Sequence, residues 1–155
     1  LGNVTAAAEF NIYADPEAAQ VVLHSGSPIT MIGLNLTHQV QVGAKETAIC
    51  HSIDTPVGSA MAYLLDFYAD FYRSHLGTDT GSMHDPCAVL AVTHPELFTF
   101  EKRYVTVEVK GQHTRGMTLV DERGAGSDSE PNCSVAYSIN PEKAVSLIMQ
   151  AVAEV

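Results

Sequence analysis

The chain has 155 residues, 46% of them hydrophobic and 17% charged, a composition typical of one globular domain with a packed core. Eight Lys and Arg stand against 18 Asp and Glu, so the formal net charge is −10. This charge repels phosphate backbones and anionic lipids, and no apolar run is long enough to span a bilayer. We therefore expect no nucleic-acid partner and no membrane association, and we treat residues 1–155 as a single domain.

Cysteine usage bears on the cellular compartment. Cys50, Cys87 and Cys133 are an odd number of widely spaced thiols without a Cys-x-x-Cys pair. This pattern favours reduced thiols over a disulfide framework and predicts a cytoplasmic protein.

Helical and extended segments alternate along the first half of the chain. Asp15 and Pro16 form an N-cap and first-turn pair that predicts a helix to about residue 24, which Gly26 ends. Residues 29–34 are an apolar run of strand length, typical of a buried parallel strand. This order of helix and strand indicates an α/β fold.

Residues 56–75 predict a long amphipathic helix. Its apolar stripe recurs at helical spacing and comprises Val57, Ala60, Met61, Leu64, Leu65, Tyr68, Phe71 and Tyr72. Residues 77–82 form a polar loop, and His84-Asp85-Pro86 then begins another helix, again with an acidic residue before proline.

The last third of the chain predicts strands followed by one helix. Residues 103–110 alternate between apolar and polar side chains, as in a half-buried strand. Residues 117–120 and 133–139 predict two more strands joined by a hairpin-like loop at 121–131. Asn140 caps a final helix whose inner face carries Val145, Ile148, Met149 and Val152.

Common catalytic motifs do not occur in this sequence. Its seven histidines include no His-Glu-x-x-His and no His-x-His, and there is no nucleophile elbow and no glycine-rich phosphate loop. A transition-metal site therefore has little support from spacing, and common nucleophilic and nucleotide-phosphate chemistries lose support.

Two polar clusters could carry chemistry. In an extended backbone Glu9 and Asn11 would project to one side, near Asn3, and could bind sugar hydroxyls. In the second cluster Asp85 could offer a carboxylate to a hard cation while His84 donates a proton to a leaving group. The structural alternative is an ordinary loop with a helix cap in the first case, and a capping Asp beside a surface His in the second.

These clusters lie within motifs that resemble the C-terminal half of the inosine-uridine-preferring nucleoside hydrolases. The resemblance covers essentially the whole chain, and it is specific because five motifs occur in order at family-like separations. The motifs are Gly2-Asn3-Val4-Thr5, residues 8–13 with 15–19, Gly33-Leu34-Asn35-Leu36-Thr37-His38-Gln39, His84-Asp85-Pro86, and residues 111–118. The family usually has Asp at the position of Asn35, a difference that changes local charge at a position we do not consider catalytic.

The resemblance implies a calcium-dependent enzyme that hydrolyses the N-glycosidic bond of ribonucleosides to ribose and a free base. It assigns Asp85 as a calcium ligand and ribose contact, and His84 as the residue that protonates the leaving base. It assigns the ribose hydroxyls to Asn3, Glu9 and Asn11, and the flank of the base to Tyr68 and Tyr72. The implied fold is an open, mostly parallel α/β sheet flanked by helices, with a short antiparallel hairpin.

The family's other signature, an N-terminal aspartate cluster that supplies most calcium ligands and the general base, has no counterpart in this sequence. Calcium takes about six to eight oxygen ligands, so Asp85 alone would hold it poorly. We therefore expect a half enzyme that is inactive without its own N-terminal half. The resemblance also implies a homo-oligomer, since the family usually forms dimers or tetramers, and a role in nucleoside salvage.

Two alternatives remain open at this stage. One is a non-catalytic ribose-binding or assembly module that lacks the metal site. The other is an unrelated histidine metalloenzyme, which requires the resemblance to be false. Base preference, purine or pyrimidine, does not follow from these residues.

Overall fold

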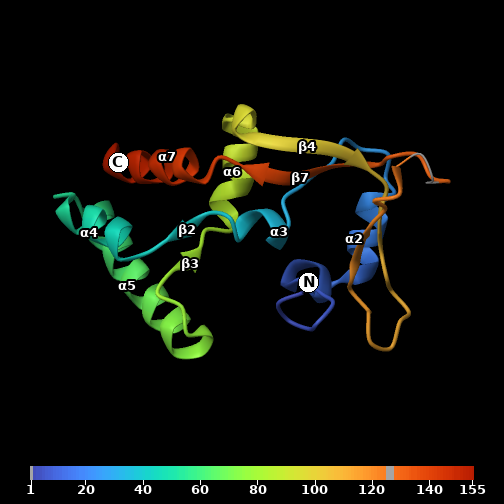
Figure 1. Ribbon diagram of the computed structural model, residues 1–155, viewed down its shortest axis with the longest axis horizontal. Helices are drawn as coiled ribbons and strands as arrows, with labels where there is room; N and C mark the ends of the chain where they lie inside the picture. Colours follow the sequence, from blue (N-terminus) through green and yellow to red (C-terminus); the bar gives the residue numbers. More distant parts are fainter. Residues whose placement is uncertain (1, 125–127) are drawn as a thin grey trace. The chain divides into compact units, whose positions relative to one another are not determined.

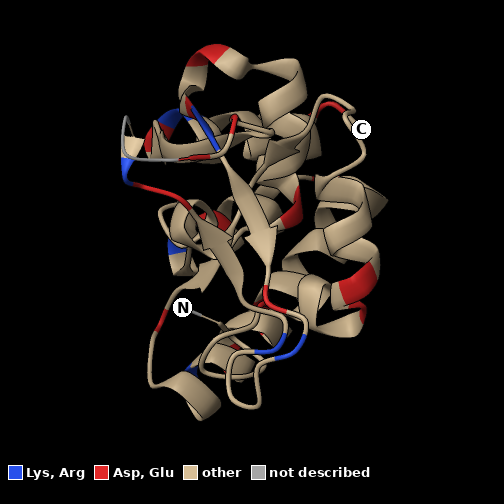
Figure 2. Cartoon of the chain, turned by 90° about the vertical axis from the view of Figure 1, so that its right-hand side faces the viewer, with Lys and Arg blue, Asp and Glu red and all other residues tan. Residues whose placement is uncertain are grey.

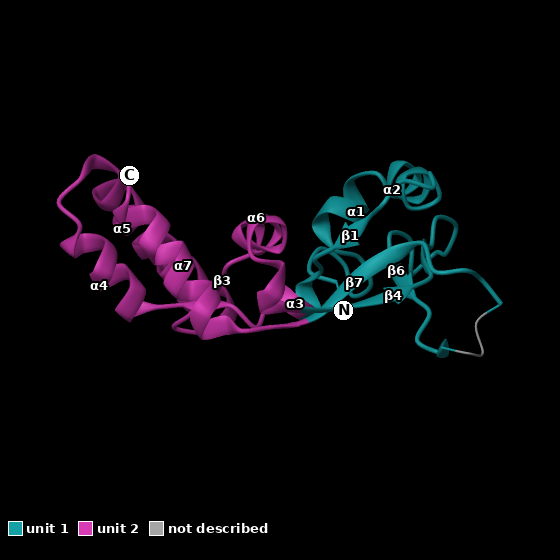
Figure 3. Cartoon of the chain, turned by 90° about the horizontal axis from the view of Figure 1, so that it is seen from above, with its two compact units in different colours: residues 1–35, 99–137 teal, residues 36–98, 138–155 magenta. Residues whose placement is uncertain are grey.

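The computed structural model describes residues 2–124 and 128–155. The chain divides into two compact units, coloured separately in Figure 3. Unit 1 comprises Leu1–Asn35 and Thr99–Tyr137, and unit 2 comprises Leu36–Phe98 and Ser138–Val155. Each unit has its own hydrophobic core.

Unit 1 is built on a three-stranded sheet with the order β1-β7-β4. Strand β1 (Thr30–Met31) pairs in parallel with β7 (Cys133–Ile139), with Thr30 opposite Ser134 and Met31 opposite Val135. Strand β4 (Phe98–Arg103) runs in the opposite direction along β7, as the arrows in Figure 1 show. The sheet is therefore mixed, and the predicted α/β class is confirmed.

A second, two-stranded antiparallel sheet in unit 1 joins β5 (Val105–Val107) to β6 (Thr118–Val120). Helices α1 (Phe10–Ala14) and α2 (Pro16–Leu23) precede the sheets in the chain, and α2 packs on β5. The core of this unit consists of Leu23, Val105, Val107, Cys133 and Val135. The alternation predicted for residues 103–110 is thus confirmed at Val105 and Val107, although the strand is shorter because Tyr104 separates it from β4.

Two expectations about unit 1 are corrected by the structure. The parallel strand predicted within 29–34 forms as β1, but it contributes two residues to the ladder, because Leu34 already begins helix α3, and Thr30 is exposed at the edge of the sheet rather than buried. The connection 121–131 is not a hairpin, because β6 pairs with β5 whereas β7 pairs with β1 and β4. Residues 125–127 of that connection lie outside the described residues.

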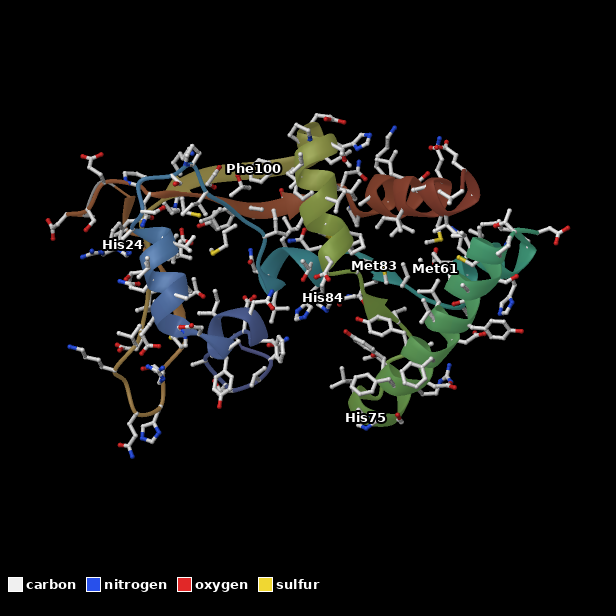
Figure 4. All side chains as sticks on the ribbon, turned by 180° about the vertical axis from the view of Figure 1, so that it is seen from behind. His24, Met61, His75, Met83, His84 and Phe100 are labelled. Carbon is white, nitrogen blue, oxygen red and sulfur yellow. The ribbon has the colours of Figure 1, made fainter. Side chains whose placement is uncertain are left out.

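Unit 2 is mainly helical. It contains α4 (Ala44–Ser52), α5 (Pro56–Leu76), α6 (Asp85–Thr93), a 3-10 turn (Pro95–Leu97) and α7 (Pro141–Ala153). Helix α3 (Leu34–Thr37) leads into it, and β2 (Gln41–Val42) and β3 (Gly81–Ser82) form a short antiparallel ladder. Helices α4, α5 and α7 pack on one another around a core of Val42, Cys50, Ala62, Leu65, Met149 and Val152. Met61 and Met83, labelled in Figure 4, pack against this core.

Helix starts follow the sequence in two of three cases. Asp15 Oδ1 accepts a hydrogen bond from Ala18 N at 2.9 Å, and Asn140 Oδ1 accepts one from Lys143 N at 3.0 Å, so both are N-caps. Asp85 is not a cap, because it is the first residue of α6 and His84 takes the cap position. The carboxylate of Asp85 is therefore not committed to capping its own helix.

Helix α5 spans the predicted range, but its apolar stripe is narrower than predicted. Leu65 is buried, and Val57, Met61, Tyr68 and Tyr72 are half-buried. Three other members of the stripe are exposed: Ala60, Leu64 and Phe71. The spacing overestimated the width of the buried face because the ladder β2–β3 and helices α4 and α7 contact one side of α5.

The three cysteines are buried free thiols. Burial raises the pKa of each of them, that of Cys87 to about 11, so the reactive thiolate is suppressed. Acidic segments outnumber basic ones and occur on several elements, as the colours of Figure 2 show. In the part of the chain that the structure describes, the helices fall short of the length and apolarity that a bilayer crossing requires.

Candidate active site

The sugar-binding residues predicted from the sequence all belong to unit 1. Asn3 Oδ1 accepts a hydrogen bond from Phe10 N at 2.9 Å, so this exposed side chain caps the start of α1. Glu9 has an extended backbone, but Asn11 lies inside α1. The predicted extended arrangement of Glu9 and Asn11 is therefore wrong, and Asn11 is exposed on the helix.

Glu9 is held by a backbone contact across the unit. Its Oε1 accepts a hydrogen bond from Leu34 N at 3.2 Å, 25 residues further along the chain. Gly33 permits this approach, since a Cβ there would lie 2.8 Å from Asn35 Oδ1 and 3.3 Å from Glu9 Oε1. Asn35 in turn donates from Nδ2 to the backbone oxygen of Ala136 at 3.0 Å. Glu9 is half-buried with one oxygen bound in this way, which fixes the direction of its carboxylate.

The residues predicted for the base side of the site all belong to unit 2. His84 precedes α6 and is half-buried, at the position labelled in Figure 4. Its Nδ1 lies 2.8 Å from Thr37 Oγ1, and the ring of His38 meets it edge to face with centroids 5.8 Å apart. Burial lowers the pKa of His84, as does the nearby His38, while the Asp85 carboxylate opposes them. The neutral imidazole therefore predominates near pH 7.

Tyr68 and Tyr72 form a pair on α5. Their hydroxyl oxygens are 3.0 Å apart, their ring centroids are 4.7 Å apart, and Tyr68 donates to the backbone oxygen of Ser82 at 2.9 Å. Burial, the contact with Tyr72 and the charge of Asp85 raise the pKa of Tyr68, which keeps the phenol neutral. The pair thus offers aromatic faces and neutral hydroxyl groups rather than charge.

Asp85 is exposed at the first turn of α6, near enough to Tyr68 to affect its titration. A calcium ion needs several carboxylate or carbonyl oxygens. The described residues contain no group of three or more His, Cys, Asp or Glu side chains placed to hold a metal ion. These residues therefore do not fit a calcium site by themselves, and Asp85 offers a single carboxylate.

The positioning groups were not found from the sequence. They are the backbone N–H of Leu34, the Thr37 hydroxyl, the backbone oxygen of Ser82 and Gly81, whose lack of a side chain lets the Tyr68 ring pack against it. Gly33, Leu34 and Thr37 belong to a motif that carries the family resemblance, but nothing in that motif reveals their partners. The predicted residues form two sets, Asn3, Glu9 and Asn11 in unit 1, and Tyr68, Tyr72, His84 and Asp85 in unit 2.

Comparison with known sequences points to one family. The profile described as inosine-uridine preferring nucleoside hydrolase matches residues 1–146. The pyrimidine-specific ribonucleoside hydrolase RihA of Shewanella woodyi is 42% identical over 152 residues, which are 97% of this chain and 48% of that protein. The enzyme of the same name from Citrobacter koseri is 42% identical over 154 residues, with 99% and 49% covered. The chain spans about half the length of the curated relatives it matches.

Solved structures agree with these relatives. A plant nucleoside hydrolase, PpNRh1, matches with a TM-score of 0.90 at 31% identity. The match covers 98% of this chain and 49% of the plant enzyme's chain. A purine-preferring ribonucleoside hydrolase from Gardnerella vaginalis matches with a TM-score of 0.88 at 33% identity. The match covers 99% of this chain and 48% of the Gardnerella chain. The predicted resemblance to one half of this fold is thereby confirmed.

Proposed function

The chain belongs to the inosine-uridine preferring nucleoside hydrolase family, and from that premise we propose that its residues form part of a site that hydrolyses the N-glycosidic bond of ribonucleosides. The observation that carries this proposal is the placement of His84 beside Asp85 at the start of α6, with His84 Nδ1 bound by Thr37. A neutral imidazole bound at Nδ1 keeps Nε2 available for a leaving base.

Glu9, Asn3 and Asn11 are proposed to bind the ribose. Hydrolysis passes through a ribosyl cation with oxocarbenium character, so oxygen acceptors around the sugar stabilise the charge that develops. The Glu9 carboxylate, with Oε1 fixed by Leu34 N, leaves its other oxygen available for a ribose hydroxyl. Such a fixed acceptor requires little reorganisation as the cation forms.

His84, Tyr68 and Tyr72 are proposed to act on the base. When water adds to the anomeric carbon and the C–N bond breaks, the base leaves with the bonding electron pair and needs a proton or a strong hydrogen bond. His84 Nε2 donates that hydrogen bond as neutral imidazole, or the proton itself as imidazolium, for about 10²–10⁴ in rate. The faces of Tyr68 and Tyr72 offer apolar contact to a nucleobase.

Asp85 is proposed to contribute one ligand to a calcium ion whose remaining ligands lie outside these residues. Calcium, when bound, would orient and acidify the attacking water. We propose accordingly that the isolated 155-residue chain is inactive and needs the complementary half of the domain, in line with its coverage of about half of its relatives.

Ribose release provides the test. The chain is assayed alone, and as a fusion to the half of the Shewanella woodyi RihA that it does not match, with uridine, cytidine and inosine. We expect release by the fusion in calcium, none with a chelator, and none from the chain alone. His84→Ala in the fusion should lower kcat by about 10²–10⁴, whereas His113→Ala at an exposed position should leave it unchanged.

Other results would change the assignment. Calcium-dependent turnover by the chain alone would refute the half-enzyme proposal. Ribonucleoside binding by a folded fusion without turnover would favour the alternative, a non-catalytic ribose-binding or assembly module. The relatives are pyrimidine-specific in one case and purine-preferring in another, so the three substrates also report base preference for this chain.

Self-association and location complete the proposal. We propose a homo-oligomer, supported by strongly exposed apolar side chains on unit 2 such as Phe67 at 75% and Val92 at 83%. Light scattering of the fusion tests the oligomeric state, and a monomer at assay concentration would contradict the proposed homo-oligomer.

Three buried unpaired thiols support a cytoplasmic location, which fractionation of the source cells tests.

A further inference from the structure

Thr37 is a buried polar residue whose side chain contacts the candidate catalytic histidine. Its relative exposure is 3%, and its hydroxyl lies 2.8 Å from His84 Nδ1 across 47 residues of sequence. In the part of the chain that the structure describes, His84 is the one side-chain partner recorded for this hydroxyl. The contact therefore determines both the hydrogen bonding of Thr37 and that of Nδ1.

The direction of this hydrogen bond follows from burial. A hydroxyl has one hydrogen to donate, and a buried donor without an acceptor costs about 1–3 kcal/mol. If Nδ1 carried the proton and donated to Thr37, the hydroxyl hydrogen would have no acceptor among the residues that the structure describes. The arrangement that satisfies both groups has Thr37 donating to an unprotonated Nδ1. The proton of the neutral ring is then on Nε2.

Both partners are held by the backbone. Met83 N, next to His84, donates to the oxygen of Val40 at 2.9 Å, and Val40 N donates to the oxygen of Thr37 at 3.1 Å. The ladder β2–β3, with Gln41 opposite Ser82, continues this connection. The Thr37–His84 contact is thus a short crosslink between two segments that already pair, which limits movement of the imidazole.

We propose that Thr37 is a positioning residue that selects the Nε2–H tautomer of His84 and points this donor toward the leaving nucleobase. Thr37 itself contacts no reacting atom. The inference rests on the proposed function for its catalytic meaning, but the tautomer is a property of this chain without substrate.

Nitrogen-15 NMR of the imidazole tests the inference directly on the 155-residue chain. At about pH 8, above the ordinary histidine pKa of about 6.5, long-range proton–nitrogen spectra distinguish a protonated ring nitrogen from an unprotonated one. The wild type should show His84 Nδ1 unprotonated and Nε2 protonated. A protonated Nδ1 in the wild type would overturn the inference without any variant.

Three variants separate positioning from general packing. Thr37→Val keeps the shape and removes the hydroxyl, so the His84 Nδ1 resonance should move toward that of a protonated nitrogen as both tautomers become populated. Thr37→Ser should restore the wild-type position. Thr47→Val, which removes another buried hydroxyl of unit 2 at 8% exposure, is the matched control and should leave His84 unchanged. Unchanged His84 resonances in Thr37→Val would refute the selection of the tautomer by Thr37.

Kinetics of the RihA fusion give the second readout. Thr37→Val should lower kcat at least about tenfold, less than removal of the acid itself, with KM little changed, and Thr37→Ser should recover most of it. A tautomer shift without loss of kcat would overturn the catalytic part of the inference. If the unaltered fusion is inactive, the proposed function fails, whereas the NMR result still decides whether Thr37 sets the tautomer.

Discussion

Replacing Gly81 with alanine should destabilise unit 2 and displace Tyr68. Gly81 is buried in β3, and the Tyr68 ring lies directly over it. A Cβ at this position would lie 2.5 Å from Tyr68 Cε1 and 2.7 Å from Cδ1, closer than carbon atoms approach in folded proteins. The ring must therefore move, and its hydroxyl must leave the backbone oxygen of Ser82.

The expected cost is the sum of two effects. Overpacking of a well-packed site costs about 1–3 kcal/mol, and the lost hydrogen bond costs about 0.5–1.5 kcal/mol more. Gly81→Ala should therefore lower the free energy of unfolding by about 1.5–4.5 kcal/mol. The pairing of Tyr68 with Tyr72, now at 4.7 Å between centroids, should be disturbed as well.

Urea unfolding followed by tyrosine fluorescence measures this cost, since the chain contains no tryptophan. Gly26→Ala is the contrasting variant. Among the described residues no atom outside its chain neighbours lies within 4 Å of the new Cβ, but Gly26 has a φ of +77°, so this variant should cost about 1–2 kcal/mol through backbone strain alone. The near-UV circular dichroism of the tyrosines should change in Gly81→Ala and not in Gly26→Ala. A Gly81→Ala chain with wild-type stability and spectrum would refute the assigned packing of Tyr68.

Three further predictions concern unit 1. Asn132→Ala removes one hydrogen bond accepted from the backbone of β5 and two donated to backbone oxygens, so urea unfolding should show a loss of about 2–4 kcal/mol. Asn132→Asp keeps the acceptor but sets a carboxylate oxygen against the backbone oxygens of Leu23 and Val105, so it should lose at least as much. Burial and Glu122 raise the pKa of Tyr137 to about 12, so its contribution to stability should be complete below about pH 10 and lost as pH rises through 12. Alkaline unfolding of Tyr137→Phe should lack that component, and an unchanged curve would contradict the shift. Arg115 donates from Nη1 and Nη2 to the two carboxylate oxygens of Glu17 at 2.7 and 2.8 Å and lowers the pKa of Glu17. This pair should therefore stabilise the fold above about pH 4.3 and lose its effect as pH falls through the lowered pKa. Glu17→Gln should abolish that dependence in acid titrations.

The elements predicted well from the sequence are those with strong local signals. The N-caps Asp15 and Asn140 begin α2 and α7 where predicted, and β7 has the predicted bounds, 133–139. Helix α4 was not predicted, because its sequence has no clear apolar face. At its start the backbone N of the N-cap residue Gly43 donates to Glu46 Oε2 at 3.0 Å. Gly43 has no capping side chain, so the sequence gives no clear start signal here.

The apolar run at 29–34 shows where periodicity stops being informative. Its residues suit a strand throughout, yet Leu34 begins a helix. The helical turn places Leu34 N within hydrogen-bonding distance of Glu9 Oε1, a contact across 25 residues that no local pattern encodes. Gly33 fits the same explanation, since a side chain there would meet both Glu9 and Asn35.

The candidate site divides in the same way between local and distant information. Residue type and motif pointed to the candidate groups for the proposed chemistry, Glu9, His84 and Asp85, because acids, amides and imidazoles are the few side chains suited to glycosidic cleavage. The groups that hold them are backbone atoms and a hydroxyl, which every chain contains in quantity. Which backbone atom or hydroxyl holds a given side chain is decided by contacts between distant residues, such as that of Thr37 with His84 across 47 residues. A variant that alters one of these positioning groups should therefore change the direction or the proton position of a candidate catalytic side chain without removing that side chain.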